Sequence, residues 1–120
     1  MTESRSDPLV NSTTSFVDYL TMTTPVWLAG ASYIVFGTLV LSATDNNTDA
    51  GARMVFDGVP SLEIDHGVVS PGGAMLYDFH TVFEDRPSSG SIDMVAEFRR
   101  AGGGGSVSAL MCRLTTWRVA

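Results

Sequence analysis

The chain has 120 residues, of which 44% are hydrophobic and 17% charged, and its formal net charge is −6. This composition is too apolar for a disordered protein, and the length suits one folded domain. The acidic balance argues against a nucleic-acid binder, because phosphate contacts need a basic face. All seven cations are arginine, which is enriched at protein interfaces, whereas lysine is depleted there. A GC-rich parent genome would produce the same bias, so both explanations stay open.

The first residues differ from the rest of the chain. Residues 1–12 are polar, contain Pro8 and show no hydrophobic period, so we expect an N-terminal arm that is disordered or ordered only against a partner. Alternation with a period of two begins after this segment, and the first strand is expected over residues 16–22. The chain therefore divides into an arm over 1–12 and a β-sandwich domain over 13–120.

The strongest strand prediction covers residues 32–43, which are rich in β-branched and aromatic residues. Gly37 and Thr38 interrupt this apolar stretch, which is much too short to span a membrane as a helix. Both faces of the strand are apolar. One face carries Tyr33, Val35, Leu39 and Leu41, and the other carries Ile34, Phe36 and Val40. A strand of this kind needs burial on both sides, within a sandwich or at a subunit interface.

Further alternating segments follow at intervals of about ten residues, separated by turn signals. They cover residues 53–57, 62–66, 75–84, 91–100 and 107–119. In the last segment, strict alternation places Val107, Ala109, Met111 and Trp117 on one face and Leu110, Cys112 and Leu114 on the other. No segment has a helical period. The pattern predicts an all-β fold, a jelly-roll-like sandwich of seven or eight antiparallel strands.

The sequence contains no convincing catalytic or metal site. Asp78 and His80 share a strand face, but a zinc site needs three or four ligands, and His66 is the only other histidine. A hydrogen bond between His80 and a carboxylate is the simpler interpretation, and a cupin-type enzyme is disfavoured. The polar turn over residues 45–49 lacks the spacing of a calcium loop. Cys112 lies in an apolar run and is expected to be buried and inert. We expect no enzyme activity and no cofactor.

A subunit interface is the more promising hypothesis. Arg99, Arg100, Arg113 and Arg118 gather in the last two predicted strands, where pairing with carboxylates explains most of them and contact with a partner explains the rest. A homo-oligomer would bury the second face of residues 33–41. The expected interface residues are Phe36, Val40, Arg113, Leu114 and Arg118.

Three stretches carry a resemblance to a known class of protein. They are residues 31–43 (ASYIVFGTLVLSA), 51–58 (GARMVFDG) and 105–119 (GSVSALMCRLTTWRV). Together they resemble the small jelly-roll structural proteins of tailed bacteriophages, which include head decoration (cement) proteins and fibre-knob domains. The resemblance implies a non-enzymatic, trimeric protein on the capsid exterior, with the major capsid protein as its partner.

The alternative from another class is a fibre-tip module that binds a receptor or a carbohydrate. Exposed aromatic side chains in a groove would distinguish it, and Tyr19, Trp27 and Tyr77 are the candidates. Neither hypothesis involves nucleic acid or a membrane.

Overall fold

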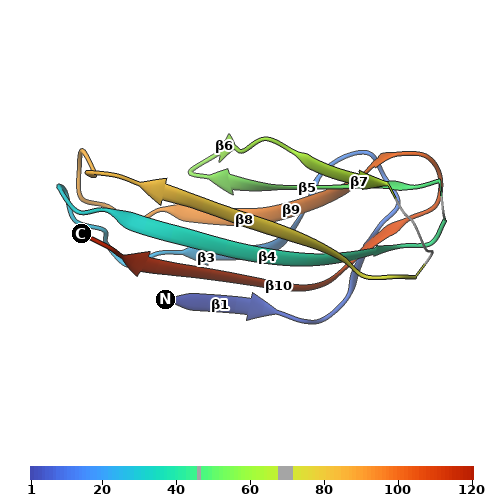
Figure 1. Cartoon of the computed structure of the whole chain (residues 1–120), viewed down its shortest axis with the longest axis horizontal. Helices are drawn as coiled ribbons and strands as arrows, with labels where there is room; N and C mark the ends of the chain where they lie inside the picture. Colours follow the sequence, from blue (N-terminus) through green and yellow to red (C-terminus); the bar gives the residue numbers. More distant parts are fainter. Residues whose placement is uncertain (46, 68–71) are drawn as a thin grey trace.

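The computed structural model describes residues 1–45, 47–67 and 72–120, and every regular element in these ranges is a β-strand (Figure 1). The strands are β1 (Thr2–Arg5), β2 (Leu9–Asn11), β3 (Val17–Thr23), β4 (Tyr33–Ala43), β5 (Asp49–Phe56), β6 (Val59–Pro60), β7 (Ile64–Gly67), β8 (Met75–Phe83), β9 (Asp93–Gly102) and β10 (Val107–Arg118). Within the described ranges there is no helix capable of crossing a membrane.

The strands form two antiparallel sheets that pack face to face in a molecule of 47 × 22 × 18 Å. Sheet A has the order β1-β10-β4-β8, with β2 also paired to β10. Sheet B has the order β3-β9-β5-β6, with β7 also paired to β5. If β1 with β2 and β6 with β7 are each counted as one interrupted strand, the eight strands have the orders 1-8-3-6 and 2-7-4-5. This is the jelly-roll topology, so the predicted fold class is confirmed.

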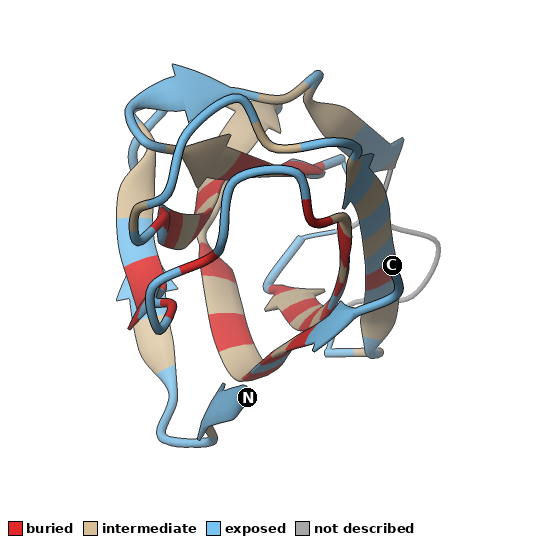
Figure 2. Ribbon diagram, turned by 90° about the vertical axis from the view of Figure 1, so that its left-hand side faces the viewer, coloured by how far each residue is buried: buried red, intermediate tan, exposed pale blue. Residues whose placement is uncertain are grey.

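Alternation along the strands builds the core between the sheets, and buried and half-buried bands alternate along them in Figure 2. On β4, Leu39 and Leu41 are fully buried, as is Leu114 on β10, while Phe36 points outward and is 43% exposed. Sheet B contributes Met94, Ala96 and Phe98 from β9 to the same core. The two faces predicted for β4 are therefore correct.

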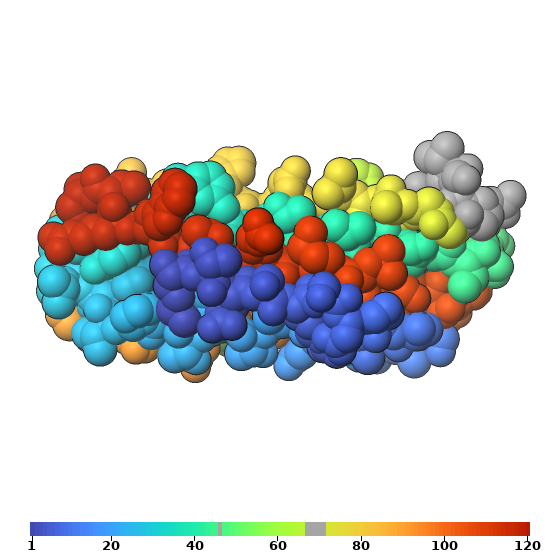
Figure 3. All heavy atoms as spheres, turned by 90° about the horizontal axis from the view of Figure 1, so that it is seen from below, coloured from blue at the N-terminus to red at the C-terminus, as the bar shows by residue number. Residues whose placement is uncertain are grey.

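The structure places residues 1–12 at the edge of sheet A and not in a separate arm. β1 pairs with β10 from Thr2 opposite Thr115 to Arg5 opposite Cys112, and Figure 3 shows this segment lying along β10. Arg5 donates a 2.7 Å hydrogen bond to the Tyr19 carbonyl, and the Asn11 side chain donates to the Phe98 carbonyl at 3.2 Å. These strands have no hydrophobic period in the sequence, because backbone pairing and polar contacts hold them in place.

A β-bulge in β10 corrects the prediction for its two faces. The register shifts between Ala109 and Met111, so one extra residue changes the phase of the alternation. Val107 and Ala109 point into the core, but beyond the bulge Leu114 is buried and Trp117 is 61% exposed. Strict alternation put Trp117 on the face of Val107 and Leu114 on the opposite face, because a period of two cannot anticipate an inserted residue.

The glycine-rich turn between β9 and β10 packs closely against the turn between β4 and β5. Gly103 has a φ of 73°, and a Cβ atom there would collide with the Asn47 backbone. Thr48 is fully buried and donates a 2.5 Å hydrogen bond to the Gly104 carbonyl. Of the polar turn predicted over residues 45–49, Asn46 lies outside the described residues.

Candidate interaction face

The outer surface of sheet A carries large apolar side chains that no other part of the described chain covers. We call it the sheet-A face and define it by the outward-pointing residues of β8, β4, β10 and β2. Leu76 is 66% exposed, Trp117 61% and Phe36 43%, and Phe36 meets Trp117 edge-to-face with a ring separation of 6.1 Å. The apolar members of the face are Val10, Ile34, Phe36, Val40, Leu76, Val82, Met111 and Trp117.

Cross-strand register arranges the face in two apolar patches separated by a polar strip. Ile34 lies between Val82 and Trp117, and Val40 lies between Leu76 and Met111.

Thr38 lies between these patches, flanked by Asp78 on β8 and Arg113 on β10, and its hydroxyl donates a 3.0 Å hydrogen bond to Asp78. The polar strip supplies groups that could fix the orientation of a partner, and the apolar patches supply area to bury.

The structure brings together three of the five residues predicted for the interface. Phe36, Val40 and Arg113 all lie on the sheet-A face. Leu114 does not, because the bulge turns its side chain into the core, where it is fully buried. Arg118 lies at the end of β10 opposite the inward-facing Tyr33, and its Nε donates to the Ala120 carbonyl at 3.1 Å.

Sequence reasoning did not assign Leu76, Val82 or Trp117 to the interface. Leu76 and Val82 could have been found, because alternation over residues 75–84 puts both on the strand face that also carries Asp78 and His80. Trp117 could not, since its outward direction depends on the bulge.

The outer surface of sheet B carries ion pairs that form within the chain. Arg53 pairs with Glu97 at 2.8 Å, and Arg99 binds Glu63 through two hydrogen bonds of 2.5 and 2.6 Å. Both guanidinium groups also stack on the Phe16 ring, at 3.8 and 4.6 Å from its centre. The side chain of Arg99 therefore has the carboxylate partner that was predicted for it.

The contacts among these charged groups shift the pKa values of two carboxyl groups on the sheet-B surface. The hydrogen bonds from Arg99 lower the pKa of Glu63, while burial and the nearby Glu63 carboxylate raise the pKa of Asp65. Arg100 has a different partner, because it donates to the Gly105 carbonyl at 2.9 Å. These charged groups of sheet B are paired within the chain, whereas the apolar side chains of the sheet-A face are exposed to solvent.

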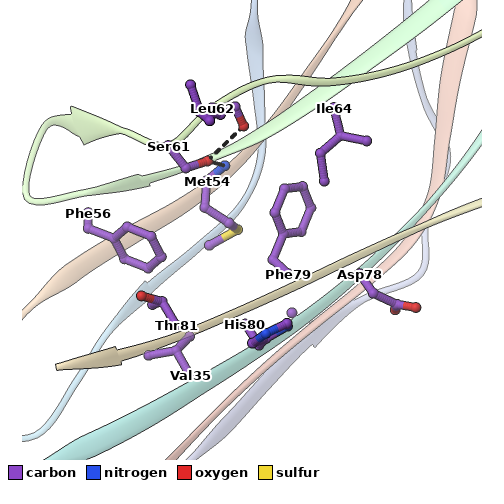
Figure 4. A pocket seen from close by; sticks show the side chains of 11 residues that line it. Val35, Met54, Phe56, Ser61, Leu62, Ile64, Asp78, Phe79, His80 and Thr81 are labelled. Atoms are coloured by element: carbon purple, nitrogen blue, oxygen red, sulfur yellow. Dashed lines mark hydrogen bonds between the residues drawn. The ribbon is translucent and has the colours of Figure 1, made fainter.

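A groove opens between the two sheets where β8 runs beside β6 and β7 (Figure 4). Its volume is about 350 Å³, and Met54, Phe56, Ile64 and Phe79 form much of its wall. Leu62 stands at its rim and is 91% exposed. The full lining is Val35, Gly37, Met54, Phe56, Ser61, Leu62, Ile64, Asp78, Phe79, His80 and Thr81.

The titratable residues singled out in the sequence are dispersed. Asp78 and His80 are both exposed on β8, with Asp78 bonded to Thr38, and the His66 ring packs edge-on against Tyr77 at 4.8 Å. Among the described residues, no cluster of three or more histidine, cysteine or acidic side chains could hold a metal ion. Cys112 is buried, as predicted, and burial raises the pKa of its thiol to about 12.

The aromatic residues proposed to line a carbohydrate groove lie inside the protein. Tyr19 and Trp27 are each 3% exposed, and Tyr77 is 1% exposed. Trp27 stacks on Tyr33 with a ring separation of 4.2 Å, and Tyr77 donates a hydrogen bond to the Ala50 carbonyl. These three residues are core residues, so they provide no support for the fibre-tip alternative.

No protein-family model matches the chain, and no curated protein matches it. Among solved structures, a VP2 subviral particle of infectious bursal disease virus superimposes with a TM-score of 0.60 at 15% identity, over 98% of this chain and 32% of VP2. The D431N mutant VP2, in T=1 particles, gives 0.61 at 17% identity, with coverage of 98% and 32%. The chain shares its jelly-roll fold with these viral capsid proteins. At this identity the likeness establishes the fold, and the chain spans about a third of the VP2 length.

Proposed function

We propose that this protein is a non-enzymatic structural component of a virion and that the sheet-A face is its assembly surface. The observation that carries the proposal is the contrast between the two outer surfaces of the sandwich. Sheet B pairs Arg53 and Arg99 with carboxylates, whereas sheet A leaves Phe36, Leu76 and Trp117 in water. A large exposed apolar surface on a soluble domain is typical of an interface.

The jelly-roll fold supports this proposal because the VP2 chains that share it form viral particles. In detail, we place the protein on the exterior of a phage head as a homotrimeric decoration (cement) protein that binds the major capsid protein. The trimer, the phage head and this partner come from the sequence resemblance. Phe36 and Trp117 are the residues expected to contribute most to association, since buried aromatic side chains dominate the energetics of interfaces.

Sedimentation of the purified chain tests this assembly. We expect the smallest stable assembly formed through the sheet-A face at micromolar concentration to be about 38 kDa, three times the chain mass of 12.8 kDa. The double substitution Phe36→Ser and Trp117→Ser should weaken association by about 100-fold or more. Val26→Ser is the matched control, because Val26 is 62% exposed but lies outside the sheet-A face.

Two results would contradict the proposal. One is a wild-type chain that stays monomeric at these concentrations. The other is an oligomer that the double substitution leaves unchanged while the fold, measured by circular dichroism, is retained. Binding to purified heads, seen by electron microscopy, tests the capsid partner separately.

A further inference from the structure

Strand β8 is an open edge of sheet A. It spans Met75–Phe83 and, among the described residues, pairs only with β4. Its other side therefore presents backbone N–H and C=O groups that can accept another strand. The groove described above lies along this edge, and Leu62 stands beside it. An open edge next to an apolar groove is suited to strand addition by a partner.

The sequence of β8 is complementary to itself when it is reversed. Its nine residues read Met-Leu-Tyr-Asp-Phe-His-Thr-Val-Phe, with Phe79 at the centre. In an antiparallel pair related by a twofold axis through Phe79, Asp78 faces His80 of the other copy, and Leu76 faces Val82. On the inner side, Tyr77 faces Thr81. Apolar residues thus face apolar residues, and an acid faces a histidine, on both sides of the axis.

The two neighbouring registers are less favourable. Residues directly opposite each other in an antiparallel pair point to the same face, so the axis must pass through a residue and not between two. An axis through Asp78 would set two carboxylates against each other, and like charges in this position are destabilising. An axis through His80 would set the two histidines against each other and leave Asp78 facing Val82.

We propose that β8 pairs with β8 of a second copy of this chain, in the register centred on Phe79. Sheet A then continues through the twofold axis as one sheet across both copies. The contact is isologous, so every pair of residues occurs twice except Phe79 with Phe79, which lies on the axis. It differs from the sheet-A face, which stays exposed on both copies. One chain thereby has two surfaces for self-association, a face and an edge, and Leu76 and Val82 on β8 belong to both.

Cysteine cross-linking tests this register, whatever the number of chains that associate through the sheet-A face. Directly opposed residues have Cβ atoms about 4.5–5.5 Å apart, close to disulfide geometry. We expect a mixture of Asp78→Cys and His80→Cys chains to form, on mild oxidation, a linked species of about 26 kDa, twice 12.8 kDa. Both positions are exposed, so the substitutions should not disturb folding, and the native Cys112 is buried.

Matched controls separate register from chance collision. Each cysteine chain alone should link several-fold less, because neither residue faces its own copy across the axis. A mixture of Asp78→Cys with Leu76→Cys should also link poorly, since these positions lie four residues out of register. Equal linking in all mixtures, or none in any, would overturn the proposal. Loss of the sheet-A oligomer alone would leave this result unchanged, so the two proposals fail separately.

A charge exchange provides a second measurement. His80→Asp should weaken edge pairing about tenfold, because it sets carboxylates opposite each other twice in each contact. The exchanged double substitution, Asp78→His with His80→Asp, should restore pairing. A double variant that pairs no better than His80→Asp contradicts the register. Linking for these variants is measured with Leu76→Cys and Val82→Cys chains, which are directly opposed in the same register.

Discussion

The hydroxyl of Tyr77 on β8 donates a hydrogen bond of 2.7 Å to the backbone carbonyl of Ala50 on β5, across the interior of the sandwich. Both residues are buried, so the bond links the two sheets where water cannot replace it. Tyr77→Phe leaves that carbonyl without its donor and should lower the free energy of unfolding by about 1–3 kcal/mol, measured in denaturant. Tyr33→Phe should lower the free energy of unfolding by less. It removes the hydroxyl that accepts a hydrogen bond from the Leu28 N–H, but Leu28 is half-exposed, so water can accept that hydrogen bond instead.

Leu114 and Trp117 test the bulge in β10. Leu114→Ala removes a fully buried side chain and should destabilise the fold by about 2–5 kcal/mol. Trp117→Ala should change the free energy of unfolding of the isolated chain much less, because its side chain is largely exposed, and should instead weaken self-association. The opposite ranking in chemical denaturation would mean that strict alternation continues through Met111.

Asn11 tests whether the N-terminal segment belongs to the sandwich. Its buried amide donates to the carbonyls of Ser15 and Phe98, and its carbonyl oxygen accepts from Thr13. Asn11→Ala leaves these groups unpaired and should cost about 1–3 kcal/mol of stability. Val10→Ala, on the same strand but 62% exposed, should change stability by less than about 0.5 kcal/mol. Equal, small effects would indicate a dispensable arm.

Gly103 and Gly104 form a matched pair in the turn before β10. Gly103→Ala forces a Cβ atom into the Asn47 backbone at a φ of 73°, so it should destabilise the fold by more than about 1 kcal/mol. A Cβ atom at Gly104 would come no closer than 3.7 Å to Asp45, and its substitution by Ala should be nearly neutral. Thermal unfolding of the two variants measures the difference.

The pair formed by Arg99 and Glu63 should make stability depend on pH. Hydrogen bonds from Arg99 hold the pKa of Glu63 below its ordinary value of 4.5. A depressed pKa in the folded state stabilises the fold above the unfolded pKa, and this stabilisation is lost as the pH falls through the folded value. The stability advantage of the wild type over Arg99→Gln should therefore be largest above pH 4.5 and shrink on acidification.

The matched control for that titration is Arg118→Gln, because among the described residues the Arg118 side chain donates to the Ala120 carbonyl and to no carboxylate side chain. Its difference from the wild type should not vary with pH. Denaturant unfolding at a series of pH values measures both variants, and an Arg99→Gln difference that stays constant into the acidic range would contradict the linkage.

Much of the fold could be predicted from the sequence because strand faces are a local property. Successive side chains of a strand point to opposite sides, so the alternation over residues 33–43 and 91–100 was enough to separate core from surface. The same alternation puts Phe36 and Val40 on the face of β4 opposite Leu39 and Leu41. It also indicated the jelly-roll class, since regularly spaced short strands with turns between them suit few other folds.

Only the tertiary structure decided which strands are neighbours, and three features of the candidate site depend on that choice. The bulge at Ala109 and Met111 arises where β10 must pair with β4 and β2 together, and it moves Leu114 inside and Trp117 outside. The N-terminal strands exist because β10 offers them an edge. The open edge of β8 exists because nothing in the described chain pairs beyond it. Sheet pairing joins residues far apart in the sequence, and no local period records it.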